Sequence, residues 1–340
     1  MIIRSKAPLR IGLAGGGTDV SPYSDIYGGA ILNATISLYA YATILPTTTN
    51  TINIHAIDRN EKIALESAAS LPINGQLDLA KGVYNRIVKE FNLQSLSFDL
   101  STYVDAPAGS GLGSSSTLVV AILGAFVEWL KLPLGEYDVA HLAYSIERED
   151  LQMQGGKQDQ YAATFGGVNY MEFYGNDNVI VNPLRIKEKH VHELEHNLVL
   201  FYTQTSRLSS EIIKQQQDNV NAKNEKSIDA MHHLKEQSVL MKEAILKGNI
   251  DNIGEILHNG WLHKKQMADG ISNASIDEIY ETALACGATG GKISGAGGGG
   301  FMIFYAPYIH KYKLIETLNT LGGKVMPYSL TNIGLTSWTI

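Results

Sequence analysis

Residues 107–117, Pro-Ala-Gly-Ser-Gly-Leu-Gly-Ser-Ser-Ser-Thr, place three glycines and a run of four hydroxyl residues between two regular elements. The preceding residues 97–104 alternate apolar and polar side chains, as in a strand, and residues 118–130 are nearly all apolar, as in a buried helix. Glycine lets the backbone approach an anion closely and adopt a positive φ. Free N–H groups at the helix start attract the same anion. The order strand, glycine loop and buried helix therefore predicts a phosphate-binding loop.

The same loop supplies the residues that we expect to contact a nucleotide. A serine there can cap the helix or coordinate a metal ion on the phosphate. The alternative is a tight turn that only joins two elements, but such a turn rarely needs three glycines followed by Ser-Ser-Ser-Thr. The predicted nucleotide-binding residues are Pro107, Gly109, Ser110, Gly111, Leu112, Gly113, Ser114, Ser115 and Ser116.

Composition limits the classes of partner. The chain has 340 residues and a formal net charge of −7, with no long block of like charge, so a nucleic-acid partner is not expected. Cys286 is the only cysteine, which fits a reducing compartment. No signal-peptide pattern opens the chain, and the longest apolar stretch, residues 118–127, is too short to span a membrane. We expect a soluble, cytoplasmic protein, either a monomer or a homodimer.

The pattern of elements predicts an α+β fold of two lobes that share a cleft. The first lobe is strand-rich, and the second is helix-rich over residues 209–267 and then returns to strands. Proline and a charge-rich stretch near residues 182–197 suggest a boundary, which gives domains 1–190 and 191–340. Expected strands are residues 2–6, 9–13, 30–46 (more than one strand), 52–57, 62–66, 168–173, 291–293, 301–306 and 323–329; expected helices are 77–91, 133–151 and 157–164.

Two further glycine-rich segments carry candidate site residues. Residues 290–300 contain seven glycines and one charge, Lys292, between strand-like flanks; this favours a loop facing a ligand over a flexible hairpin. Residues 7–19 place Arg10 in an apolar strand and Asp19 after a triple-glycine bend. Arg10 could be a structural cation and Asp19 a helix cap, but together they suggest a polyhydroxyl or phosphate substrate.

In order and spacing, residues 6–19, 107–117 and 292–301 resemble the three motifs of the GHMP kinases, the small-molecule kinases of galactose, homoserine, mevalonate and phosphomevalonate. The resemblance covers nearly the whole chain. It implies the two-lobed GHMP kinase fold, with a returning antiparallel sheet in the second lobe. It also implies ATP and Mg²⁺ as cofactors and a small-molecule acceptor.

Residues 146–160 resemble the galactokinase stretch that carries a metal-binding glutamate and a catalytic aspartate, which fall here on Glu147 and Asp159. The resemblance assigns Ser115 and Glu147 to Mg²⁺, Asp159 to the general base, and Arg10 to activation of the hydroxyl and stabilisation of transition-state charge. Phosphoryl transfer needs such groups, because it depends mainly on positioning and charge neutralisation. A solvated helix-face charge is the alternative for Glu147, and a charge in a helical first turn for Asp159. Participation of Ser114 or Ser116 at the metal stays open.

The first motif narrows the acceptor. Galactokinases have Gly-Glu-His-Thr-Asp where this chain has Gly15-Gly-Gly-Thr-Asp19, and residues 15–35 and 202–210 instead resemble the D-glycero-D-manno-heptose 7-phosphate kinases. Those enzymes phosphorylate the anomeric hydroxyl to give the 1,7-bisphosphate, on the route to GDP-heptose and surface glycans. L-Fucose kinases have a related motif and are the alternative. Expected substrate-binding residues are Gly16, Gly17, Thr18, Asp19, Lys157, Arg207, Gly295, Ala296, Gly297 and Gly298; Lys157, Arg207 and Lys292 are either ligands of a second phosphate or surface charges.

Two other classes of function compete with a kinase. His192-Glu-Leu-Glu-His196 fits the H-E-x-x-H pattern of zinc hydrolases, but its charged surroundings indicate an exposed helix and no third ligand is evident. A non-catalytic sugar and nucleotide sensor would not need Arg10, Glu147 and Asp159 together.

Overall fold

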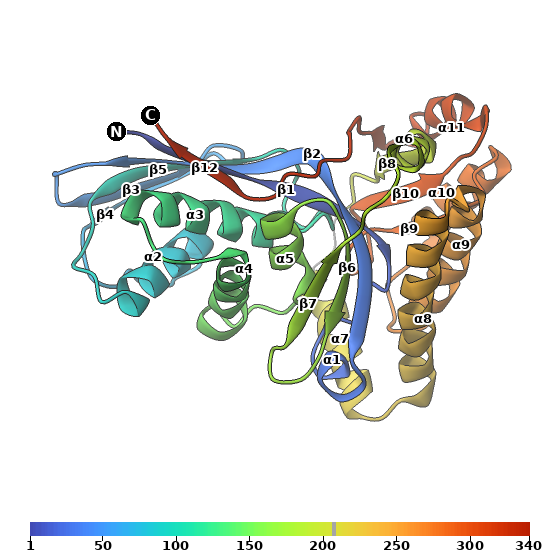
Figure 1. The fold of residues 1–340 in the computed structure, drawn as a ribbon, viewed down its shortest axis with the longest axis horizontal. Helices are drawn as coiled ribbons and strands as arrows, with labels where there is room; N and C mark the ends of the chain where they lie inside the picture. Colours follow the sequence, from blue (N-terminus) through green and yellow to red (C-terminus); the bar gives the residue numbers. More distant parts are fainter. Residues whose placement is uncertain (206–208) are drawn as a thin grey trace.

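A computed structural model describes residues 1–205 and 209–340. Its fold is α+β with two lobes, as expected (Figure 1). Strands within these ranges form two sheets: a larger one in the order β12-β1-β2-β5-β3-β4, with β6 and β7 joined through β2, and an antiparallel one in the order β11-β8-β10-β9. The larger sheet comprises β1 (Ile3–Ala14), β2 (Gly29–Pro46), β3 (Thr51–Ala56), β4 (Glu61–Glu66), β5 (Phe98–Val104), β6 (Val168–Phe173), β7 (Val179–Pro183) and β12 (Thr336–Thr339).

Helices of the first lobe cover one face of the larger sheet (Figure 1). They are α2 (Asp78–Glu90), α3 (Ser114–Leu130), α4 (Glu136–Ser145), the π-helical turn η1 (Ile146–Asp150) and α5 (Gln158–Phe165); the short α1 (Tyr23–Tyr27) follows the first glycine bend. The helix α3 is buried on nearly every side through Phe126, because the run that follows the glycine loop is almost entirely apolar. That burial fixes the start of α3 relative to the sheet.

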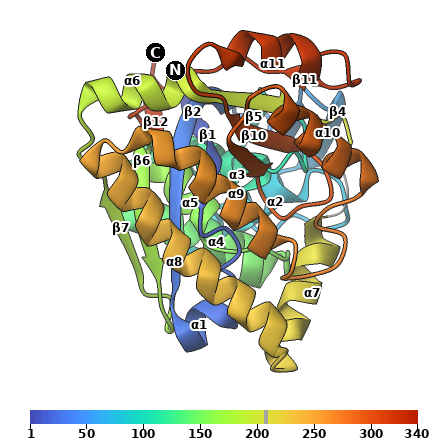
Figure 2. The same ribbon diagram turned by 90° about the vertical axis from the view of Figure 1, so that its right-hand side faces the viewer.

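The second lobe contains the smaller sheet and helices that pack on both sheets (Figure 2). Its strands are β8 (Leu198–Tyr202), β9 (Gly290–Ile293), β10 (Phe301–Tyr305) and β11 (Lys324–Val325). Its helices are α6 (Glu188–Asn197), α7 (Ser209–Asn221), α8 (Glu225–Lys247), the 3₁₀ turn η2 (Ile250–Asn252), α9 (Ile253–Lys264), α10 (Ala274–Ala285) and α11 (His310–Leu318). Three of these helices, α9, α10 and α11, pack against the smaller sheet, whereas α8 packs against α9 and against β1 and β2 of the larger sheet. Fully buried Trp261 is part of this second core.

Several elements differ from the sequence expectation in their extent. Residues 2–6 and 9–13 form the single strand β1, because a register shift between Pro8 and Arg10 absorbs the break in alternation. Residues 30–46 likewise form one strand, β2, whose two halves pair with β6 and β5. The helix expected over 133–151 begins at Glu136 and changes to π-helix at Ile146. The strand expected over 323–329 is only β11.

The last strand returns to the first lobe. β12 pairs antiparallel with β1, so residues 336–339 complete the sheet that begins at residue 3, and both ends of the chain lie together (Figure 1). The domain limits 1–190 and 191–340 stay a prediction. Among the described residues, no helix combines the length and apolar character needed to cross a bilayer.

Candidate active site

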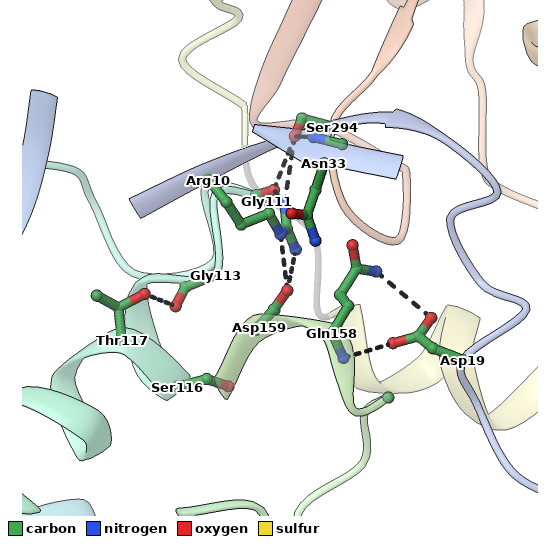
Figure 3. Close-up of polar contacts among 12 residues, drawn as sticks. Arg10, Asp19, Asn33, Gly111, Gly113, Ser116, Thr117, Gln158, Asp159 and Ser294 are labelled. Carbon is green, nitrogen blue, oxygen red and sulfur yellow. Dashed lines mark hydrogen bonds and ion pairs between the residues drawn. The ribbon is translucent and has the colours of Figure 1, made fainter. Parts of the chain in front are cut away.

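The three glycine-rich segments meet at the side chain of Arg10 (Figure 3). β1 carries Arg10 into the interior, where the residue is almost fully buried. Its guanidinium donates to the carbonyl oxygen of Gly111 at 2.5 Å and to Oγ of Ser294 at 3.3 Å. Ser294 in turn donates to the same Gly111 carbonyl at 3.1 Å. One cation thus links the first motif to the other two.

Arg10 also forms an ion pair with Asp159, the second residue of α5 (Figure 3). The Nε and Nη2 atoms of Arg10 lie 2.7 and 2.6 Å from Oδ1 of Asp159. This geometry fixes the carboxylate, whose side chain stays 22% exposed toward a cavity. Asp159 faces the start of α3, because a Cβ placed on Gly113 would lie 3.0 Å from its Cγ. The predicted catalytic pair is therefore adjacent to the predicted phosphate loop.

Two of the glycine loops pack backbone against backbone. A Cβ on Gly111 would lie 2.1 Å from the carbonyl oxygen of Ser294, and a Cβ on Gly295 would lie 2.6 Å from Cα of Gly111. The N–H of Phe301 donates to the carbonyl oxygen of Ser110 at 2.9 Å. The glycines at these positions are required by the contact between the loops as well as by any ligand.

A cavity of about 520 Å³ lies between these loops and the second lobe. Gly109, Gly111, Gly113 and the three serines that begin α3 line one side. The first N–H groups of a helix have no partner within the helix, so the start of α3 presents donors to this space. Other predicted residues of the loop serve its structure: Leu112 is fully buried in the core, the backbone of Ser110 binds β10, and Pro107 is exposed.

Glu147 lies on the π-helical turn η1 and lines the same cavity. Ser116 donates to its Oε1 at 3.0 Å, and the side-chain amide of Gln160 donates to Oε2 and to Ser116. Burial raises the pKa of Glu147, although Arg148, Ser116 and Gln160 oppose the shift. A buried carboxylate whose charge is incompletely compensated is a suitable ligand for Mg²⁺, which typically takes one or two carboxylates together with phosphate oxygens.

Asp19 connects the first glycine bend to the helix that carries Asp159. Its Oδ2 accepts from the backbone N–H of Gln158 at 3.0 Å, and Oδ1 accepts from the Gln158 side chain at 3.4 Å (Figure 3). Asp19 thus caps the start of α5 from a distant segment while also lining the cavity. Burial raises the pKa of Asp19, and the N–H of Gln158 opposes that shift.

The other predicted substrate residues divide into two groups. Gly17, Gly295 and Ala296 line the cavity beside Asp19. Thr18 holds the bend closed, since its hydroxyl donates to the carbonyl oxygens of Gly15 and Ala30 at 2.8 and 3.0 Å. Gly16 lies next to two buried lysine ammonium groups. Gly297 and Gly298 pack against Ile271, the latter through a 2.9 Å hydrogen bond.

Lys157, Lys292 and Arg207 are the candidate ligands of a second phosphate, and the two that the structure describes have different partners. Lys157 pairs with Asp177 at 2.8 Å and Asp25 at 3.6 Å, so its charge is compensated within the protein. Lys292 is buried and donates to the carbonyl oxygen of Gly12 at 2.9 Å. Arg207 lies outside the described residues.

A second cavity of about 290 Å³ adjoins the first. The two cavities share Ser115 and Met153. Apolar side chains dominate its lining, among them Ile54, Leu118 and Ile122, with Asp58, Arg59 and Asp78 at its polar part. An apolar cavity next to a phosphate loop has the character of a site for a nucleotide base.

Comparison with known proteins agrees with this geometry. The family of GHMP kinase N-terminal domains matches residues 78–167, and that of the C-terminal domains matches residues 241–321. The D-glycero-alpha-D-manno-heptose 7-phosphate kinase of Campylobacter jejuni is 49% identical over 338 residues, covering 99% of each chain. The chain belongs to the GHMP kinase family. It is therefore a phosphotransferase that acts on a hydroxyl acceptor.

Other relatives of this GHMP kinase include solved structures at high identity. The crystal structure of a D-glycero-D-manno-heptose 1-phosphate kinase from Bacteroides thetaiotaomicron is 49% identical, with a TM-score of 0.85 over 99% of each chain. The bifunctional fucokinase/GDP-fucose pyrophosphorylase of Arabidopsis thaliana is more distant, at 26% identity over 90% of this chain and 30% of its own length. The recognition of the family from its three motifs is confirmed.

Sequence reasoning missed several residues that line the cavity of this GHMP kinase. Lys264 of α9 and Gln216 of α7 are both 2% exposed. A signal was present: Lys264 follows Leu257 and Trp261, and Gln216 lies between Ile212 and Val220, at the helical spacing of core positions. A polar residue at a core position of an amphipathic helix is a candidate site residue.

The H-E-x-x-H pattern lies on α6, and this helix is exposed, as the sequence predicted. His192 and His196 are exposed, and His192 Nε2 lies 3.6 Å from Glu188 one turn earlier. Across residues 1–205 and 209–340, no group of three or more His, Cys, Asp or Glu side chains is arranged to hold a metal ion.

Proposed function

We propose that this GHMP kinase transfers the γ-phosphoryl group of ATP to the anomeric hydroxyl of D-glycero-D-manno-heptose 7-phosphate. The product would be the 1,7-bisphosphate used for GDP-heptose and surface glycans. The observation that carries the chemistry is the Arg10–Asp159 ion pair, which adjoins the start of α3 and lines the same cavity. The 49% identity to a heptose 7-phosphate kinase over 99% of the chain supports the acceptor.

The carboxylate of Asp159 is suited to receive the proton of the acceptor hydroxyl. As the hydroxyl oxygen forms its bond to the γ-phosphorus, the bond between phosphorus and the β,γ-bridging oxygen breaks and ADP leaves. Arg10 holds the carboxylate in place with two nitrogen atoms, and its positive charge would lie beside the transferred group. Its hydrogen bond to Gly111 ties that charge to the phosphate loop.

The loop residues provide the nucleotide site. We assign the triphosphate to the glycines from Gly109 to Gly113 and the N–H groups that begin α3, and the base to the adjoining apolar cavity. Glu147 and a serine of the first turn of α3 would hold Mg²⁺, which supplies charge neutralisation on the β- and γ-phosphates. Ser115 is the serine that the family resemblance favours, whereas Ser116 is the one that contacts Glu147 in the structure.

The assignment is tested by incubating the protein with ATP, Mg²⁺ and a panel of heptose 7-phosphate, L-fucose, D-galactose and mevalonate. We expect ADP release with the heptose phosphate at a higher kcat/KM than with the others, and a phosphorus NMR signal of a new phosphate at C1. A higher kcat/KM with L-fucose would contradict the proposed acceptor and identify the enzyme as an L-fucose kinase. Binding of sugar and nucleotide without ADP release would indicate a sensor.

A further inference from the structure

Two polar side chains of the second lobe line the cavity without a complete set of partners. Lys264 ends α9, and in the described part of the chain its Nζ makes a single hydrogen bond, 3.3 Å long, to the carbonyl oxygen of Gly16, and no ion pair. Gln216 is in the middle of α7, and its Nε2 is buried with no hydrogen-bond partner among the described residues. An ammonium has three donors and an amide nitrogen two, so both side chains hold unused donors.

Both residues lie beside the first glycine bend and line the same cavity. The Nζ of Lys264 is 3.9 Å from the point where a Cβ on Gly16 would lie, and Oε1 of Gln216 is 3.5 Å from the corresponding point on Gly17. Asn219 and Ser227 fix this region, since both donate to the carbonyl oxygen of Met267, at 2.9 and 2.8 Å. Hydrogen bonds to Met267 therefore stabilise the region that carries Lys264 and Gln216.

The charge of Lys264 is expensive to bury without an anion. Burial lowers the pKa of Lys264 to about 8, Asp19 opposes the shift, and Arg10 adds to it. Lys292, close to the same bend, has its pKa lowered by burial and by Lys264. An anion bound beside Lys264 would compensate a positive charge that the protein leaves largely uncompensated.

The position of the pair separates it from the nucleotide. Arg148 is another cation that lines the cavity, but it lies on the side that we assign to the nucleotide. It donates to the carbonyl oxygens of Met153 and Gly156, and Met153 borders the second cavity, which we assign to the base. Lys264 and Gln216 adjoin Gly16 and Gly17 instead, on the side of the cavity formed by the second lobe. Asp19 lies in the same first bend and electrostatically couples to both Asp159 and Lys264.

We propose that Lys264 and Gln216 form a subsite for the phosphate group that the acceptor sugar carries at the end opposite its reacting hydroxyl. This inference rests on the proposed function. It assigns the phosphate that the acceptor sugar already carries to residues outside the three motifs. A charged donor and an amide donor suit a phosphate monoester, because hydrogen bonds to charged groups are stronger than those between neutral groups. The subsite would make the enzyme prefer a sugar phosphate to the free sugar.

The test compares D-glycero-D-manno-heptose 7-phosphate with unphosphorylated D-glycero-D-manno-heptose in steady-state assays of wild type, Lys264→Met and Gln216→Met. For Lys264→Met we expect KM for the heptose phosphate to rise about 10- to 100-fold, while KM for the free heptose and for ATP changes little. Gln216→Met should produce a smaller change in the same direction. The ratio of kcat/KM for the two sugars is the readout, because a reduced fraction of folded enzyme cancels from it.

Lys265→Met is the matched control. Lys265 is the neighbouring residue, more exposed, and its Nζ lies 3.6 Å from Asp277, so this substitution removes the same charge without touching the subsite. It should leave the ratio unchanged. If Lys264→Met and Gln216→Met leave the ratio at its wild-type value, the subsite is disproved while the proposed function stands. If wild type phosphorylates neither sugar, the proposed function itself fails.

Discussion

At the scale of single residues, Arg10 and Asp159 act as one unit. Arg10 is buried, whereas the partly exposed side chain of Asp159 lines the cavity. Residues of the phosphate loop lie next to this pair and would still bind the nucleotide if the carboxylate lost its charge. Binding and chemistry should therefore be separable by substitution.

Asp159→Asn should lower kcat by about 10²- to 10⁴-fold, because the amide cannot accept the proton of the acceptor hydroxyl. The dissociation constant for ATP, measured by calorimetry, should stay close to that of wild type. Asp150→Asn is the control, since Asp150 is exposed and pairs with Arg86 at 2.6 Å. An unchanged kcat for Asp159→Asn would remove this residue from the mechanism.

Glu147→Gln should raise the Mg²⁺ concentration that gives half-maximal activity by about 10- to 100-fold. The change keeps the shape of the side chain but removes the charge held by Ser116 and Gln160. Because burial raises the pKa of Glu147, the wild type should also need more Mg²⁺ as the pH falls and the carboxyl group takes up a proton.

The matched control for this prediction is Glu149→Gln, at an exposed site two residues later that pairs with Arg86. Its Mg²⁺ requirement should follow that of wild type at each pH. A pH-dependent Mg²⁺ requirement that persists in Glu147→Gln would assign the metal to another group.

At the scale of elements, contact between two glycine loops positions the site. Gly109 and Gly111 both have positive φ, +72° and +83°, but only Gly111 touches the other loop. A Cβ on Gly109 would have no atom within 4 Å, whereas one on Gly111 would lie 2.1 Å from a backbone oxygen. The two positions separate the effect of backbone conformation from that of loop packing.

Gly109→Ala should lower the free energy of unfolding by about 1 kcal/mol, the cost of a left-handed conformation. Gly111→Ala should lower it by about 2–4 kcal/mol, because the loops must also move apart. It should weaken ATP binding as well, since Gly111 holds Arg10 through its carbonyl group. Urea unfolding and ATP titration measure both effects; equal losses in the two variants would contradict the role of loop contact.

At the scale of the whole molecule, the cavity is built by both lobes. The first lobe contributes β1, α3, η1 and α5, and the second contributes α7, α9 and the loop before β10. Ligands that occupy this space must therefore stabilise segments far apart in the sequence.

Hydrogen exchange should show this coupling. ATP alone should slow exchange mainly in the first lobe, in residues 107–117 and around the second cavity, whereas ATP with heptose 7-phosphate should also slow it in α7 and at the end of α9, where Gln216 and Lys264 line the first cavity. Mass spectrometry of peptides from both lobes measures the effect. Protection confined to the first lobe with both ligands present would contradict an acceptor site shared between lobes.

A feature could be predicted from the sequence when the residues that define it are neighbours in the chain. The phosphate loop and α3 could be predicted because glycine, hydroxyl and apolar residues follow one another within residues 107–130. Lys157 and Lys264 could not be ranked in the same way. Each is a lysine near a candidate motif or helix end, and only the packing shows that Asp177 compensates the first while the second has no ion pair among the described residues.

By itself the sequence determined the glycine loops, the buried helix after them and, through the order of three motifs, the family. Those features depend on the conformational freedom of glycine and on apolar spacing, which neighbouring residues reveal. Only the tertiary structure decided that Arg10 meets Asp159, 149 positions away, and that Gln216 and Lys264 share a cavity with both. Such meetings depend on how sheets and helices pack around two cores, and no short stretch of sequence carries that information.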